Sequence, residues 1–127
     1  MPQTVLQVFQ DSRGRIPFQE WIDDLEDREP AAYAKCLATL LRLESFGYEL
    51  RRPTADQLGN GIYELRFRVR NVQYRVLYFF HGQNAVVISH GFTKESKIPP
   101  QEIDTAVEHM KLVKKDPKKH MASWKVE

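Results

Sequence analysis

The most constraining feature of this sequence is a strict alternation of side-chain character between residues 63 and 70. The members at odd-numbered positions are large and mainly apolar, whereas the members at even-numbered positions are charged: Tyr63, Leu65, Phe67 and Val69 against Glu64, Arg66, Arg68 and Arg70. Successive side chains of a β-strand point to opposite faces of the sheet. The segment is therefore predicted to be a strand with one packed face and one cationic face. Guanidinium groups in a row suit the binding of phosphate, and RNA is the first candidate.

The remaining periodicity predicts an α+β fold. The expected elements, in chain order, are a strand at 5–9, helices at 17–26 and 30–46, strands at 62–69, 72–81 and 84–92, and a helix at 99–114. Turn-forming residues separate the last three strands, which indicates a meander of hairpins. This β-α-α-β-β-β-α order favours an antiparallel sheet with the helices packed on one face, and residues 50–61 are expected to link the second helix to the sheet.

Length and charge limit the possible functions. The chain has 127 residues, which favours one domain, and no apolar run is long enough to span a membrane. No signal peptide is visible, and the single Cys36 is expected to be a buried helical residue, so a reducing cytoplasm is expected. Residues 1–49 carry a net charge of −4 and residues 50–127 a net charge of +6, which points moderately to nucleic acid.

The candidate site is formed by cations of the strand-rich half. Arg66 and Arg68 should share a face, and Arg75 of the next strand should lie beside one of them. Lys94 and Lys97 follow the last strand, near the same edge. Such a cluster could bind a phosphodiester and stabilise its more negative transition state. The alternative is a solvated face paired with acidic side chains, and Arg70 and Arg68 fit that alternative as well as a role in RNA binding.

Two further residues have open roles. Glu64 shares the face of Arg66, so it is either a general base or, as the pattern favours, an ion-pair partner that separates the arginines. His90 on the last strand could act as an acid or a base, although a packed imidazole is the commoner case. Metal binding has no support, because no Cys/His pairs show ligand spacing and the acidic run at 23–27 does not match a calcium loop.

Three segments together carry a family likeness. Residues 61–66 (GIYELR), 74–78 (YRVLY) and 90–99 (HGFTKESKIP) resemble the RelE/HigB toxins in order and spacing, with the phage-derived HigB-like branch as the best match. The resemblance covers about residues 3–113, which are expected to form the toxin domain. Residues 114–127 are then expected to be a basic, flexible C-terminal tail.

The resemblance implies a RelE/ParE-like fold and the toxin of a type II toxin–antitoxin module. It implies cleavage of mRNA on the ribosome by attack of a ribose 2′-hydroxyl on the neighbouring phosphate, with no metal or other cofactor. The implied partner is an antitoxin, often a helix-turn-helix protein, through which alone operator DNA would be bound.

Position by position, the resemblance implies catalytic roles for Arg66, Arg75 and Lys94. Glu64 departs from the family pattern, because a well-known branch has lysine there. A family tyrosine soon after Lys94 is also missing, and Ile98-Pro99-Pro100 stands in its place. The general base is therefore open between Glu64 and His90. A second hypothesis remains beside the nuclease: a non-catalytic binding module for nucleic acid or protein, including a ParE-like toxin that acts on gyrase.

Overall fold

The computed structural model describes residues 4–93 and 97–126. Its elements in chain order are β1 (Val5–Phe9), α1 (Pro17–Arg28), α2 (Pro30–Phe46), the short 3₁₀ helix η1 (Gly47–Glu49), β2 (Ala55–Gly59), β3 (Ile62–Val69), β4 (Val72–His81), β5 (Ala85–Thr93), α3 (Pro100–Lys115), α4 (Pro117–His120) and β6 (Met121–Ser123). A proline occupies the first turn of α1, α2 and α3, where its missing N–H costs no helical hydrogen bond.

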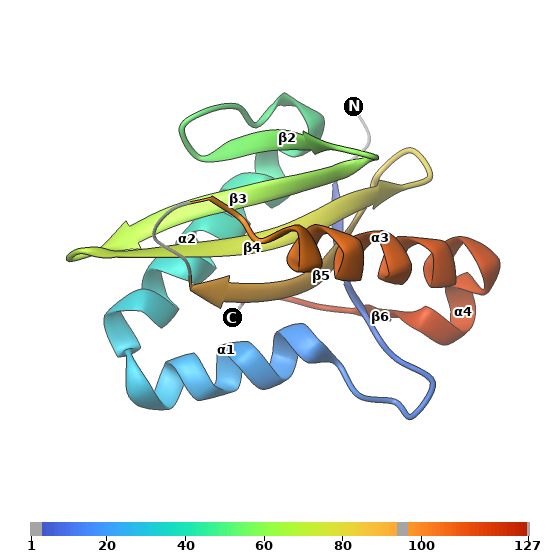
Figure 1. Cartoon of the computed structure of the whole chain (residues 1–127), viewed down its shortest axis with the longest axis horizontal. Helices are drawn as coiled ribbons and strands as arrows, with labels where there is room; N and C mark the ends of the chain where they lie inside the picture. Colours follow the sequence, from blue (N-terminus) through green and yellow to red (C-terminus); the bar gives the residue numbers. More distant parts are fainter. Residues whose placement is uncertain (1–3, 94–96, 127) are drawn as a thin grey trace.

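The strands form one sheet in the order β2-β3-β4-β5-β1-β6, which confirms the predicted α+β class (Figure 1). The expected meander is β3-β4-β5, and Arg70 with φ of 56° makes the first turn together with Asn71. The sheet is not wholly antiparallel, because β1 runs parallel to β5. The segment predicted as a link contains β2, which pairs with the first half of β3.

The prediction that all helices cover one face is wrong. Figure 1 shows α3 in front of the sheet and α2 behind it. Each face has its own buried cluster: Leu65 and Val76 belong to the cluster shared with α1 and α2, whereas Leu77 and Phe79 belong to the cluster under α3. The central strand β4 is apolar on both faces because both faces are covered.

Part of the segment expected to be a basic, flexible tail forms α4 and β6. β6 pairs with β1 in antiparallel register, and the indole Nε1 of Trp124 donates to Oε1 of Gln19 at 2.8 Å. The imidazole of His120 is buried and its Nδ1 lies 2.8 Å from the carbonyl of Gln10. The strand β1 is therefore an inner strand, between β5 and β6.

The helix α1 packs closely on β5 where Trp21 lies against Gly91. A Cβ atom built on Gly91 would overlap the ring of Trp21, so only glycine leaves room for this indole. Cys36 is buried in α2 as predicted, and its burial raises the pKa of the thiol to about 12. Across the described residues, none of the helices combines the length and the apolar character needed to cross a bilayer.

Candidate active site

The central feature of the site is a cross-strand pair of arginines. Arg66 of β3 lies directly opposite Arg75 of β4, and Glu64 of β3 lies opposite Leu77. Directly opposed and alternate residues share a face, so Glu64, Arg66 and Arg75 all project toward the side of the sheet that α3 covers. The structure therefore brings together three of the predicted site residues.

Glu64 is enclosed between the two arginines. Its Oε2 accepts a hydrogen bond from Nη1 of Arg75 at 2.7 Å, and its Oε1 lies 3.6 Å from Nε of Arg66. The side chain of Glu64 is only 4% exposed, that of Arg75 is 11% exposed, and that of Arg66 is 30% exposed. A charge buried this deeply requires a close partner, and Arg75 provides it.

The two arginines differ in how much of each guanidinium group is accessible to a ligand. Arg75 is committed to Glu64, whereas Arg66 is the most exposed member of the cluster. Its Nε is buried and makes no hydrogen bond among the described residues, although Glu64 lies nearby. Glu64 thus holds Arg66 at 3.6 Å, while the Arg66 side chain stays 30% exposed. Arg66 can therefore present an oriented cation to an anionic ligand.

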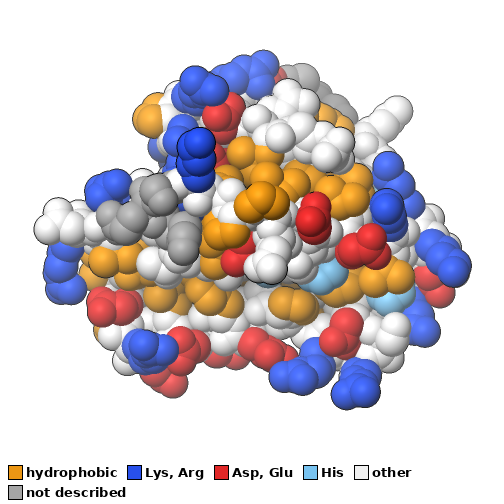
Figure 2. Space-filling view, viewed as in Figure 1, with side chains coloured by type: hydrophobic (Ala, Val, Ile, Leu, Met, Phe, Trp, Pro, Cys, Tyr) orange, Lys and Arg blue, Asp and Glu red, His pale blue; other side chains and the backbone are white. Residues whose placement is uncertain are grey.

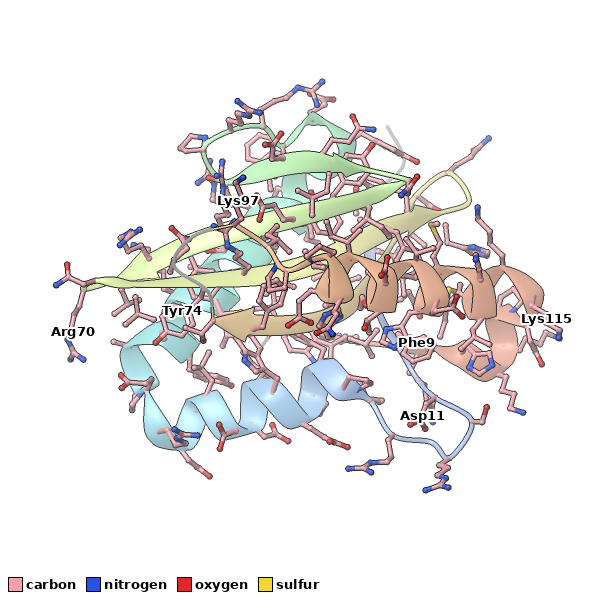
Figure 3. The ribbon with its side chains drawn as sticks, viewed as in Figure 1. Phe9, Asp11, Arg70, Tyr74, Lys97 and Lys115 are labelled. Atoms are coloured by element: carbon pink, nitrogen blue, oxygen red, sulfur yellow. The ribbon has the colours of Figure 1, made fainter. Side chains whose placement is uncertain are left out.

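His90 is held in a network that sequence reasoning missed. Its Nε2 lies 3.0 Å from Oε1 of Glu102 on α3, and its Nδ1 lies 2.8 Å from Oγ of the fully buried Ser89. The same hydroxyl lies 2.8 Å from Nδ1 of His109, whose ring stacks on Phe9 with centroids 3.7 Å apart (Phe9 is labelled in Figure 3). Glu102 and His109 are seven residues apart, a spacing of about two helical turns that could have indicated a shared face.

The hydrogen bonds of this network have one consistent direction. His109 donates to Ser89, Ser89 donates to His90, and His90 donates to Glu102. Burial lowers the pKa of His90, against the hydrogen bond and charge of Glu102. Burial, then the nearby His90, lowers the pKa of His109 to about 4. Both rings are thus kept neutral near pH 7, and both nitrogens of His90 are engaged.

Three of the remaining predicted cations, Arg68, Arg70 and Lys97, belong to the described part of the chain. Arg68 is exposed and donates from Nη2 to Oε1 of Gln73 at 3.3 Å. Arg70 is 75% exposed at the hairpin tip, where it lies 3.6 Å from Glu29. Lys97 is seen over β3 in Figure 3, and Lys94 lies outside the described residues.

Charge is unevenly distributed on the face that carries α3. Figure 2 shows Lys and Arg side chains toward the upper left, in the region of β2 and β3, and along the right-hand edge near α4, with several acidic side chains along the lower rim near α1. This distribution agrees with the opposite net charges of the two halves of the sequence. In the ranges that the structure describes, no group of three or more His, Cys, Asp and Glu side chains is arranged to hold a metal ion.

Comparisons with known proteins point in one direction. Residues 20–111 match a family described as "Phage derived protein Gp49-like". The chain is also 30% identical over 102 residues to proteins named "Probable endoribonuclease HigB1" from two strains of Mycobacterium tuberculosis, CDC 1551 and H37Rv. Each alignment covers 80% of this chain and 78% of the relative. The matched family region contains the arginine pair, Glu64 and the whole β3-β4-β5 meander.

Proposed function

The chain belongs to the phage-derived Gp49-like family, and on that premise we propose that it is the toxin of a type II toxin–antitoxin module that cleaves mRNA. The observation that carries the proposal is the pair Arg66–Arg75, fixed across two strands by the buried Glu64. The relatives named as probable endoribonucleases support RNA as the substrate.

The proposed reaction is an attack of a ribose 2′-hydroxyl on the adjacent phosphorus. The 2′ oxygen loses a proton and forms the new P–O bond, the bond from phosphorus to the 5′ oxygen breaks, and the 5′ oxygen gains a proton. Negative charge grows on the phosphate oxygens in the transition state, and preoriented cations stabilise that charge best. Arg66 would contact these oxygens. Arg75, which lies opposite Arg66 and bonds to Glu64, would stabilise the same negative charge without direct contact.

The structure gives unequal support to the other candidates. Glu64 would orient the arginines, because a carboxylate this buried does not reach a 2′-hydroxyl. His90 would hold α3 to the sheet, since both of its nitrogens have partners. Lys94 would donate a proton or charge, as the family resemblance implies. Arg68 and Lys97 would bind flanking RNA, and Arg70 would contribute least because it pairs with Glu29.

The proposal extends to the setting of the reaction. Cleavage would occur in the cytoplasm on ribosome-bound mRNA, with the charge supplied by the arginines instead of a metal ion. A helix-turn-helix antitoxin would be the partner that restrains the toxin and binds operator DNA. The family resemblance supports each of these points.

Growth arrest tests the proposal. Expression of the chain in bacteria without an antitoxin should stop growth, and Arg66→Ala should relieve the arrest. Arg70→Ala is the matched control, because it removes the same charge from an exposed position of the same hairpin. Removing one oriented donor of this kind costs about 10²- to 10³-fold in rate. Normal growth with abundant folded wild-type protein would refute the proposal, and equal toxicity of both variants would refute the role of Arg66.

A further inference from the structure

A second basic region lies where β2 stops covering β3. β2 pairs only with residues 62–65, and the N–H of Arg66 donates to the carbonyl of Thr54 at 2.7 Å. Beyond that point a cavity of about 390 Å³ separates the open edge of β3 from α2. Its polar lining includes Lys35, Thr39 and Arg42 of α2, Arg66 and Arg68 of β3, and Gln73 of β4.

The cavity lining is rich in cations, and among them Arg66 has a carboxylate partner in Glu64. Four of its lining residues are Lys or Arg and none is Asp or Glu. Lys35 and Arg42 are seven residues apart on α2, so they lie on one face of the helix. Cations gathered in this way repel one another, and an anionic ligand relieves that repulsion.

Neutral acceptors hold these cations in place. Nζ of Lys35 donates to the carbonyl of Arg68 at 2.9 Å, and Nη1 of Arg42 donates to Oγ1 of Thr54 at 2.9 Å. Within residues 4–93 and 97–126, neither cation forms an ion pair with a carboxylate. A guanidinium has five N–H donors, so Arg42 keeps donors for a ligand while its position is fixed.

Arg66 connects this cavity to the candidate active site. Arg66 lines the cavity, where its N–H bonds to Thr54, and its side chain lies beside Glu64. We propose that the cavity binds the phosphodiester backbone of the RNA strand next to the cleaved linkage, with Lys35 and Arg42 as the phosphate-binding residues. This inference rests on the proposed function. The cavity volume of about 390 Å³ can admit a phosphate group, and the hydroxyl and amide groups of its lining suit a ribose.

Binding of a non-cleavable RNA tests the proposal independently of cleavage. The probe is a short single-stranded RNA with 2′-O-methyl groups, which lacks the attacking hydroxyl. Its affinity for the protein is measured by fluorescence anisotropy at several salt concentrations. The test variant is Lys35→Gln with Arg42→Gln, which removes two charges but keeps a hydrogen-bond donor at each position. The control is Arg28→Ala with Lys111→Ala, which removes two charges from exposed residues elsewhere.

The test variant should bind the RNA about tenfold or more weakly. Its plot of log affinity against log salt should lose about 0.7 in slope per lost phosphate contact, whereas the control should keep the wild-type slope. Thermal unfolding verifies that both variants are folded. If the folded test variant kept the wild-type affinity and the wild-type salt slope, the proposal would be overturned. An acidic partner protein would then be the better candidate for the ligand of the cavity. Failure of the proposed function would appear instead as wild-type protein that cleaves no RNA.

Discussion

Glu64 is the residue whose role the structure changes most. In the sequence it directly precedes a row of alternate arginines, and its role was open between a general base and an ion-pair partner. Its burial and its contacts with Arg75 and Arg66 favour the partner. A single acid can thus support two cations at directly opposed positions of neighbouring strands, where like charges alone would be destabilising.

Replacing Glu64 by Gln tests this role. The change removes the charge of a buried carboxylate that contacts Arg75 at 2.7 Å and Arg66 at 3.6 Å, so we expect the free energy of unfolding to fall by roughly 3 kcal/mol. Urea denaturation measures that loss. Cleavage should weaken because the arginines lose their alignment, while the shape of its pH dependence stays unchanged. Full stability combined with complete loss of cleavage would instead identify Glu64 as the general base.

At the scale of elements, the packing of α3 depends on neutral histidines. The ring of His109 lies against Phe9 of β1 and bonds to Ser89 of β5. Three charged or titratable neighbours act on it: His90 and His120 lower its pKa and Asp11 raises it. The helix is therefore expected to be held less firmly in acid.

The sign of the pH effect follows from the pKa of His109, which falls from 6.5 to about 4 on folding. Between these values the unfolded chain binds a proton that the folded chain excludes, so stability present above pH 6.5 is lost as the pH falls. By pH 5 the loss is at most about 2 kcal/mol. Urea denaturation above pH 6.5 and at pH 5 measures the free energy of unfolding. This free energy should fall at pH 5 in the wild type and fall less in His109→Gln. His81→Gln is the control, and equal acid sensitivity of all three proteins would contradict the account.

Removal of the C-terminal strand is a second test at this scale. A chain that ends at Asp116 lacks α4 and β6, which exposes the edge of β1 and removes the contact between Trp124 and Phe18. We expect a lower melting temperature and a tendency to aggregate. Circular dichroism and light scattering measure both effects. An unchanged melting temperature would show that the segment is dispensable, as a flexible tail would be.

The sequence predicted the elements with strong periodicity and missed those set by long-range pairing. The alternation in β3 and the helical spacing in α2 are local signals, and both elements are where they were expected. β2 and β6 are short, and β6 is stabilised by β1, more than 100 residues away in the chain. The same reason explains why one-face packing was predicted: periodicity shows that α3 has an apolar face but does not show which face of the sheet it covers.

At the scale of the whole molecule, the site was predicted in part. Alternation correctly placed Arg66 and Glu64 on one face, and strand pairing placed Arg75 opposite Arg66. The sequence did not reveal that Arg75 is buried, nor that Ser89, Glu102 and His109 engage His90. Those properties depend on α3 folding back over the sheet. The molecule thus combines a rigid sheet with an arginine at its accessible edge.

The most direct test of the central claim is to map new RNA ends. Cellular mRNA is isolated shortly after induction of the wild type, Arg66→Ala and Arg70→Ala, and primer extension locates fresh 5′ ends. The wild type and Arg70→Ala should produce discrete ends within coding regions, and Arg66→Ala should reduce their rate of appearance about 10²-fold or more. Intact mRNA in arrested wild-type cells, with DNA damage instead, would contradict the nuclease and support a toxin that acts on gyrase.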